Sequence, residues 1–119
     1  MKIFRIFVFA LILFGGMACH PKAYTLVQYN VGAFKKYDDS SIDAIARVVK
    51  ELDADAVTFN EVDSCTRSTG NVDQMKAFAE SMVDWNQFYA AAMPFRGGAY
   101  GVGVASSPDL KVVRTDRIA

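Results

Sequence analysis

Two polar residues stand where the sequence could place the ligands of a metal ion. Asn30 lies near the end of residues 24–31, which are rich in β-branched and aromatic side chains, and Glu61 directly follows a similar stretch at residues 56–60. If these strands run parallel, both residues lie at the edge of the sheet where ligands bind. One carboxylate beside one amide suits Mg²⁺, which accepts only one or two protein carboxylates. Polar residues that merely cap strand ends would have the same spacing, so both interpretations stay open.

The other reactive side chains exclude the common thiol and hydroxyl hydrolases. A catalytic cysteine or serine needs a nearby base. The single histidine of the chain, His20, lies far from Cys65 in the sequence and close to the N-terminal leader. We therefore expect Cys65 to be an unpaired residue in a polar loop.

The elements that must position Asn30 and Glu61 follow from the hydrophobic pattern. A polar loop at residues 32–40 precedes a helix that is expected to begin near Ser41. Its apolar stripe has helical spacing and consists of Ile42, Ile45, Val49 and Leu52. Strand, helix and strand within about 40 residues predict a crossover unit with two parallel strands.

The rest of the chain adds a second helix and further strands. After a polar loop at residues 63–70, the second helix is expected to bury Val72, Met75, Phe78, Ala79 and Met82. Strands are predicted at residues 85–93 and 100–106, joined by residues 94–98, with a last strand at residues 111–118. Gly103 is expected to allow close packing of its strand.

The first 19 residues have the layout of a bacterial export signal. A basic start with Lys2 and Arg5 precedes an unbroken apolar run and then small residues. The run is shorter than the ~20 residues that cross a bilayer. Cys19 stands where a lipoprotein signal is cut, so we expect it to carry a lipid anchor at the bacterial cell envelope. Plain secretion to the periplasm or the medium is the alternative. Residues 20–23 would then form a tether and residues 24–119 one domain.

The charge balance limits the partners of the mature chain. Removing Lys2 and Arg5 with the signal leaves 11 of 13 basic residues against 13 acidic ones, a net charge of −2. A weakly acidic chain has no broad electrostatic attraction to nucleic acid or anionic lipid. A phosphate-binding site would therefore be local. The composition also excludes disorder, collagen, coiled coils and disulfide scaffolds.

Four short segments occur in a recognisable order. They are Tyr29-Asn30-Val31, then Asn60-Glu61-Val62-Asp63 after Ala54-Asp55-Ala56-Val57, then residues 67–74, and the glycine-rich residues 98–106. Together they resemble the opening of the endonuclease/exonuclease/phosphatase superfamily, the DNase I-like metal-dependent phosphoesterases. The resemblance covers about residues 24–118.

This resemblance implies a fold, a metal and a set of site residues. The fold is α/β (α+β), a DNase I-like four-layer αββα sandwich of which the N-terminal half is present here. Glu61 would bind Mg²⁺ or Mn²⁺, and Asn30 would orient a site that cleaves phosphodiesters or phosphomonoesters. Arg67, Gln74 and Tyr100 are candidates to line it. The alternatives are a solvated loop for Arg67, a helix-cap contact for Gln74 and a packed strand aromatic for Tyr100. Lys35 and Lys36 could meet a phosphate or form a solvated pair.

The sequence also departs from the pattern of that family. Asn60 replaces the usual glutamine before the metal-binding glutamate, and Gly32 stands where many of its nucleases carry an acid. The later motifs, an Asp-x-Asn pair and a C-terminal Asp-His, are absent. Attack by water needs a proton acceptor, and one metal carboxylate alone does not supply it. We therefore expect an N-terminal fragment without activity of its own.

Three functional hypotheses follow. The first is a Mg²⁺-dependent phosphoesterase acting on a phosphorylated small molecule, a lipid headgroup or a nucleic acid; the fold does not choose among these substrates. The second, from another class, is a non-catalytic envelope lipoprotein, held at the membrane through Cys19, that keeps half the fold as a binding module. The third is a degenerate reading frame without function.

Overall fold

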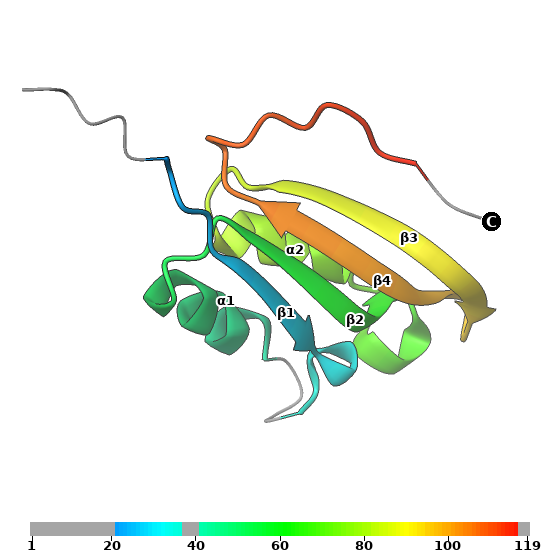
Figure 1. Cartoon of the computed structure of the whole chain (residues 1–119). Coiled ribbons are helices and arrows are strands. Elements are labelled where there is room, and N and C mark those ends of the chain that lie inside the picture. The colour runs from blue at the N-terminus through cyan, green and yellow to red at the C-terminus, as the bar shows by residue number, and fades with distance from the viewer. Residues whose placement is uncertain (1–20, 37–40, 117–119) are drawn as a thin grey trace, which may run out of the picture.

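The computed structural model describes residues 21–36 and 41–116 of the chain (Figure 1). The expected export signal with Cys19 and the first tether residue, His20, lie outside the described residues. Within the described part, the helices are too short or too polar to cross a membrane.

Four strands form one mixed sheet in the order β1-β2-β4-β3. Strands β1 (Leu26–Asn30) and β2 (Ala56–Ser64) are parallel, whereas β4 (Gly98–Ser106) runs antiparallel to β2 and to β3 (Asn86–Phe95). Helix α1 (Ile42–Glu51) connects the parallel pair. The predicted crossover unit is therefore confirmed, and it brings the ends of β1 and β2 to the same edge of the sheet.

Helices α1 and α2 (Gln74–Ser81) cover one face of this sheet (Figure 1). Alternate strand residues point to that face, since Val57 and Phe59 are fully buried while Thr58 between them is not. The helices contribute the buried side chains Ile45, Ala46, Val49, Met75, Phe78 and Met82. The chain is an α+β domain with one helix layer and one sheet layer.

A cluster of aromatic rings packs the loop after β1 against this core. Phe34 belongs to a short 3₁₀ turn, η1 (Gly32–Phe34), and its ring meets Phe59 edge-on at 5.5 Å. Phe78 of α2 meets Phe59 in the same way at 4.7 Å. Edge-to-face pairs of this kind add roughly 0.5–1.5 kcal/mol to the free energy of burial. The loop that follows Asn30 is therefore held by the hydrophobic core.

Gly103 shows why β4 can lie so close to helix α2. A Cβ atom added at this residue would stand 2.2 Å from the sulfur of Met75, so any side chain here would force the buried Met75 side chain to move. The expected role of Gly103 in close packing is confirmed, and its partner is the helix.

Several expectations about the elements are wrong. Val72 precedes α2 and is 39% exposed, so the second helix does not bury it. Strand β2 does not stop before Glu61 but continues to Ser64, because residues beyond Glu61 pair with β4. The expected strand at residues 111–118 is not formed over residues 111–116, which pair with no strand among the described residues. Leu52 follows the last turn of α1 and is 51% exposed, so it is not part of the buried stripe.

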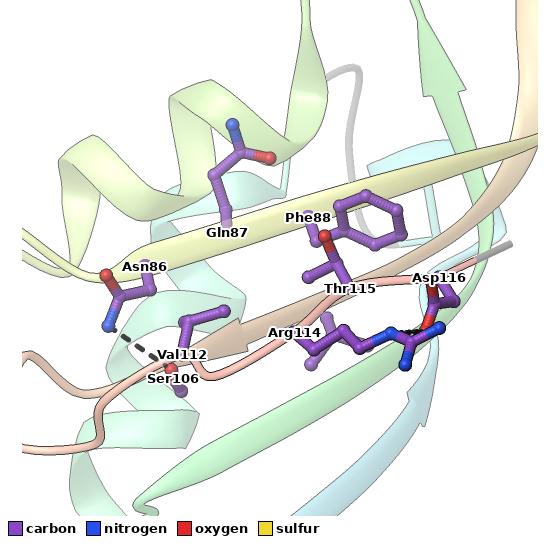
Figure 2. A pocket seen from close by; sticks show the side chains of 9 residues that line it. Asn86, Gln87, Phe88, Ser106, Val112, Arg114, Thr115 and Asp116 are labelled. Atoms are coloured by element: carbon purple, nitrogen blue, oxygen red, sulfur yellow. Dashed lines mark hydrogen bonds and ion pairs between the residues drawn. The ribbon is translucent and has the colours of Figure 1, made fainter.

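The sheet face opposite the helices carries exposed apolar side chains on β1 and β4. Leu26 is 68% exposed there, and Val102 and Val104 are 45% and 43% exposed. The C-terminal segment crosses this side of the sheet over β3 and the end of β4, and together they line an open pocket of about 330 Å³ whose wall includes Val104. Figure 2 shows Val112, Arg114 and Thr115 of that segment opposite residues of β3 and β4.

Candidate functional site

Glu61 lies at a β-bulge in β2. The pairing with β4 shifts between Phe59 and Val62, so two residues of β2, Asn60 and Glu61, stand opposite the single residue Val102. Glu61 has a φ of +58°, the left-handed conformation, and no other non-glycine residue within the four described strands has a positive φ. Such a conformation costs about 1–3 kcal/mol. The bulge turns the Glu61 side chain out of the regular alternation and leaves the residue exposed.

Asn30 lies beside this bulge on the neighbouring strand. It is the last residue of β1 and is paired with Asn60 of the adjacent strand β2. Glu61 is the next residue along β2. Its side-chain oxygen accepts a hydrogen bond of 3.1 Å from the backbone N–H of Gly32. This bond fixes the direction of the amide and leaves a second lone pair on the oxygen. The structure thus brings Asn30 and Glu61 to one edge, as their positions at parallel strands predict.

Tyr100 approaches Glu61 from strand β4. Its Cα is paired with that of Asp63, two residues beyond Glu61 on β2. Burial raises the pKa of the Tyr100 hydroxyl above its ordinary value, and the negative charges of Glu61 and Asp63 raise that pKa further. The ring also packs edge-on against Phe95 at 5.9 Å, so the packed aromatic that was one interpretation of this residue is present too. Tyr100 therefore combines a rigid ring with a protonated donor.

Gln74 is a buried link between three segments. Its side chain is only 3% exposed. The amide oxygen accepts from the backbone N–H of Asp63 at 2.8 Å, and the amide nitrogen donates to the carbonyl of Ala33 at 2.7 Å. The residue thus ties helix α2 to strand β2 and to the loop after β1. Both side-chain hydrogen bonds go to backbone groups of other segments, so Gln74 does not form the helix-cap contact considered above. Because the side chain is buried, it is also not positioned to contact a substrate from solvent.

Lys35 and Lys36, in the loop after β1, both contact other residues of the chain. The Lys35 ammonium donates to the carbonyl of Ser68 at 2.5 Å and so joins the loops that follow β1 and β2. Lys36 lies over the ring of Tyr29, with 5.8 Å between its nitrogen and the ring centre. Both lysines are exposed, so their charge still reaches solvent at this edge.

Arg67 is exposed and lies against the turn between β3 and β4. Its backbone N–H donates to the carbonyl of Arg96 at 3.0 Å. A Cβ atom at Gly97 would stand 2.7 Å from a guanidinium nitrogen of Arg67, which shows how closely the side chain covers that turn. The residue starts a short 3₁₀ turn, η2 (Arg67–Thr69), and Cys65 before it is an exposed free thiol, as expected.

Asp63, which sequence reasoning did not single out, anchors that loop. It is 1% exposed, and one carboxylate oxygen accepts a hydrogen bond of 2.6 Å from the hydroxyl of Thr66. Ser68 and Thr69 direct their hydroxyls to the same oxygen at 3.4 and 3.3 Å. An acid followed by four hydroxyl residues within six positions is the signal that could have identified this turn.

The exposed oxygen donors at the bulge are few. They are one exposed carboxylate, Glu61, and the amide oxygen of Asn30, while Asn60 offers another exposed amide between them. No group of three or more histidine, cysteine, aspartate or glutamate residues within the described part of the chain could enclose a metal ion. An all-protein cage is therefore absent from the described residues, whereas Mg²⁺ is commonly bound through one or two carboxylates with waters completing its shell.

Comparison of the chain with protein-family profiles, with curated proteins and with solved structures finds no match. The assignment of the site therefore depends on its residues and their geometry.

Proposed function

We propose that the protein is a Mg²⁺-dependent (or Mn²⁺-dependent) phosphoesterase of the DNase I-like kind and that the bulge of β2 supplies its metal carboxylate. The observation that carries the proposal is Glu61 itself: an exposed glutamate held in a strained conformation within a strand, directly after Asn60, which is paired with Asn30. Strain persists where surrounding structure imposes it, and it concentrates at functional sites.

The residues of the site have distinct tasks in this proposal. A divalent ion bound by Glu61 would offset negative charge on a phosphoryl oxygen of the substrate. Asn30, whose amide is fixed by Gly32, orients the ligands at the end of β1. Lys35 and Arg67 leave positive charge at the loops after β1 and β2, where an anionic phosphate ester would arrive. Substrates with a phosphate group, whether a small molecule, a lipid headgroup or a nucleic acid, share that chemistry.

The proton acceptor for water attack is not assigned to any residue of the described site. The carboxylate nearest to Glu61 in the strand, Asp63, is buried and bound by the loop hydroxyls. In this proposal the acceptor comes from outside the described residues. The two-layer arrangement is consistent with half of a four-layer sandwich, because the open face of the sheet is where a second sheet would pack.

Activity of the protein purified from its native cells tests the proposal. Hydrolysis of bis(4-nitrophenyl) phosphate and of 4-nitrophenyl phosphate is measured with Mg²⁺ or Mn²⁺. We expect Glu61→Gln to lower kcat/KM by at least about 100-fold, since a group that stabilises transition-state charge is lost. The matched control is Glu51→Gln, at the exposed end of α1, which should retain the wild-type rate. Equal rates for Glu61→Gln and wild type would contradict the proposal.

A second candidate function is a non-catalytic binding module of the cell envelope, anchored through Cys19. It is favoured by the exposed apolar residues Leu26, Val102 and Val104 on the open sheet face, which a partner would cover. Native protein that lacks phosphatase and phosphodiesterase activity with either metal, yet elutes in a complex, would favour this function. An active monomer would argue against it.

A further inference from the structure

We propose that strand β3 is an interface at which two copies of this chain pair edge to edge and join their sheets into one. The strand lies at the opposite edge of the sheet from β1 and Asn30. The inference is therefore independent of the metal site proposed at Glu61.

Strand β3 is the longer of the two edge strands of the sheet (Figure 1). It has ten residues, whereas β1 at the other edge has five. One side of β3 pairs with β4, and within the described part of the chain no strand pairs with its other side. Residues 111–116 cross the face of the sheet and make no backbone hydrogen bond to β3 among the described residues. The outer edge of β3 is therefore accessible to a further strand.

The backbone groups that point to this outer edge can be assigned from one close approach. A Cβ atom added at Gly101 of β4 would stand 2.1 Å from the carbonyl oxygen of Ala90, so this carbonyl points toward β4. In an antiparallel pair the N–H and C=O groups of one residue share a direction, and the direction alternates along the strand. The backbone groups of Gln87, Tyr89 and Ala91 therefore point away from β4 and toward the open edge.

Most of β3 has none of the features that protect exposed edges from pairing. Charged side chains, proline and β-bulges are the usual protection. No charged residue occurs at positions 85–95. The bulge between Ala91 and Met93 and the proline at position 94 affect only the last part of the strand. The stretch at residues 86–91 is regular, uncharged and free of proline.

The charges at the two ends of β3 match a second copy of this chain as the partner. Asp84 precedes the strand and Arg96 follows it, and both residues are exposed. Antiparallel pairing of two copies about a point near Ala90 places the start of one β3 beside the end of the other. Asp84 of each copy would then lie near Arg96 of the other, so the same attraction occurs at both ends of the interface.

Space beside the start of β3 allows this approach. An open pocket of about 430 Å³ lies between α2 and the strand, and Trp85 and Gln87 form part of its lining. In the proposed dimer, this pocket faces the end of the second copy's β3.

Sedimentation velocity of the full chain in detergent, measured over a range of concentrations, tests the inference. We expect a monomer–dimer equilibrium. Asp84→Lys or Arg96→Glu alone places like charges together at both ends and should raise the dissociation constant by about tenfold or more. The double variant restores opposite charges and should return to within about threefold of wild type. The matched control is Asp53→Lys, another exposed aspartate with a positive φ but distant from β3 in the sequence, which should leave the dissociation constant unchanged.

Amide hydrogen exchange shows whether β3 is the strand that pairs. The N–H groups of Gln87, Tyr89 and Ala91 should exchange more slowly as the protein concentration rises, because they gain hydrogen bonds only in the dimer. The N–H groups of Phe88 and Ala90 point toward β4 and should exchange at a rate that does not depend on concentration.

Three results would overturn the inference. The first is a monomer at every concentration. The second is a dimer that the single charge reversals do not weaken or that the double variant does not restore. The third is slowed exchange at β1 with none at the outward N–H groups of β3, which would place the contact at the other edge of the sheet.

Discussion

Glu61 occupies a backbone conformation that glycine adopts at little cost and glutamate does not. Its φ of +58° lies in the left-handed region, yet the residue is in the middle of a nine-residue strand. Selection for stability alone would favour glycine at this bulge. In the proposed function, the exposed carboxylate of this glutamate is the reason for a non-glycine residue at the bulge.

The strain at Glu61 should set the order of stability of two substitutions there. Glu61→Gly should be more stable to urea than Glu61→Ala by about 1 kcal/mol, because only glycine relieves the left-handed strain. The same pair of substitutions at Glu51, within the regular helix α1, should have the opposite order, since glycine destabilises a helix by about 1 kcal/mol relative to alanine. A Glu61→Gly variant less stable than Glu61→Ala would show that the bulge is not strained.

At the scale of the elements, Gln74 determines how the loops of the site are held together. Gln74→Ala would leave the N–H of Asp63 and the carbonyl of Ala33 without their partner in the interior. Each unsatisfied buried group costs roughly 1–3 kcal/mol, so we expect a loss of about 2–4 kcal/mol in the free energy of unfolding. Urea denaturation measures this loss.

The control for Gln74 is Gln87, an exposed residue of β3. Gln87→Ala should change stability by no more than about 0.5 kcal/mol. Similar small effects for both glutamines would mean that the contacts of Gln74 do not hold the loops.

The elements also show how far the sequence could predict this structure. The stripe with Ile45 and Val49 predicts α1, and the apolar strands on either side predict the parallel pair, because both patterns are local. The passage of β2 through Glu61 was missed because a bulge depends on pairing with a strand 40 residues away in the chain. Residues 111–116 alternate like a strand, but alternation forms a strand only where a neighbouring edge pairs with it.

In the candidate site, too, features that depend on local sequence were predictable and long-range contacts were not. The positions of Asn30 and Glu61 at adjacent strands were predictable from their place in the crossover unit. The pairing of Tyr100 with Asp63 and the hydrogen bond from Gln74 to Ala33 were not predictable, because they join residues about 40 positions apart through the fold. Local spacing holds no information about such contacts.

The whole molecule presents one sheet face with exposed apolar side chains. Val102 and Val104 alternate on β4 and are 45% and 43% exposed. Replacing both with threonine keeps the β-branched shape and removes apolar surface. We expect the double variant to bind the dye ANS several-fold more weakly than wild type, while its free energy of unfolding changes by less than about 1 kcal/mol.

The corresponding control lies on the covered face of the same sheet. Val57→Thr places a hydroxyl in the core beneath the helices, where Val57 is fully buried, and should destabilise the protein by about 1–3 kcal/mol. If Val102→Thr/Val104→Thr destabilises as strongly as Val57→Thr, the face is already covered within the molecule and is not open to a second layer.

The central claim is that the bulge at Glu61 binds a divalent cation. The most direct measurement is the line broadening that substoichiometric Mn²⁺ produces in the amide NMR spectrum of the protein. We predict that broadening is strongest at Asn30, at Asn60 to Val62 and at Tyr100, and that Glu61→Gln removes it. Broadening centred on other carboxylates, such as Asp53 and Asp55 at the opposite end of β2, or no selective broadening at all, would contradict the account.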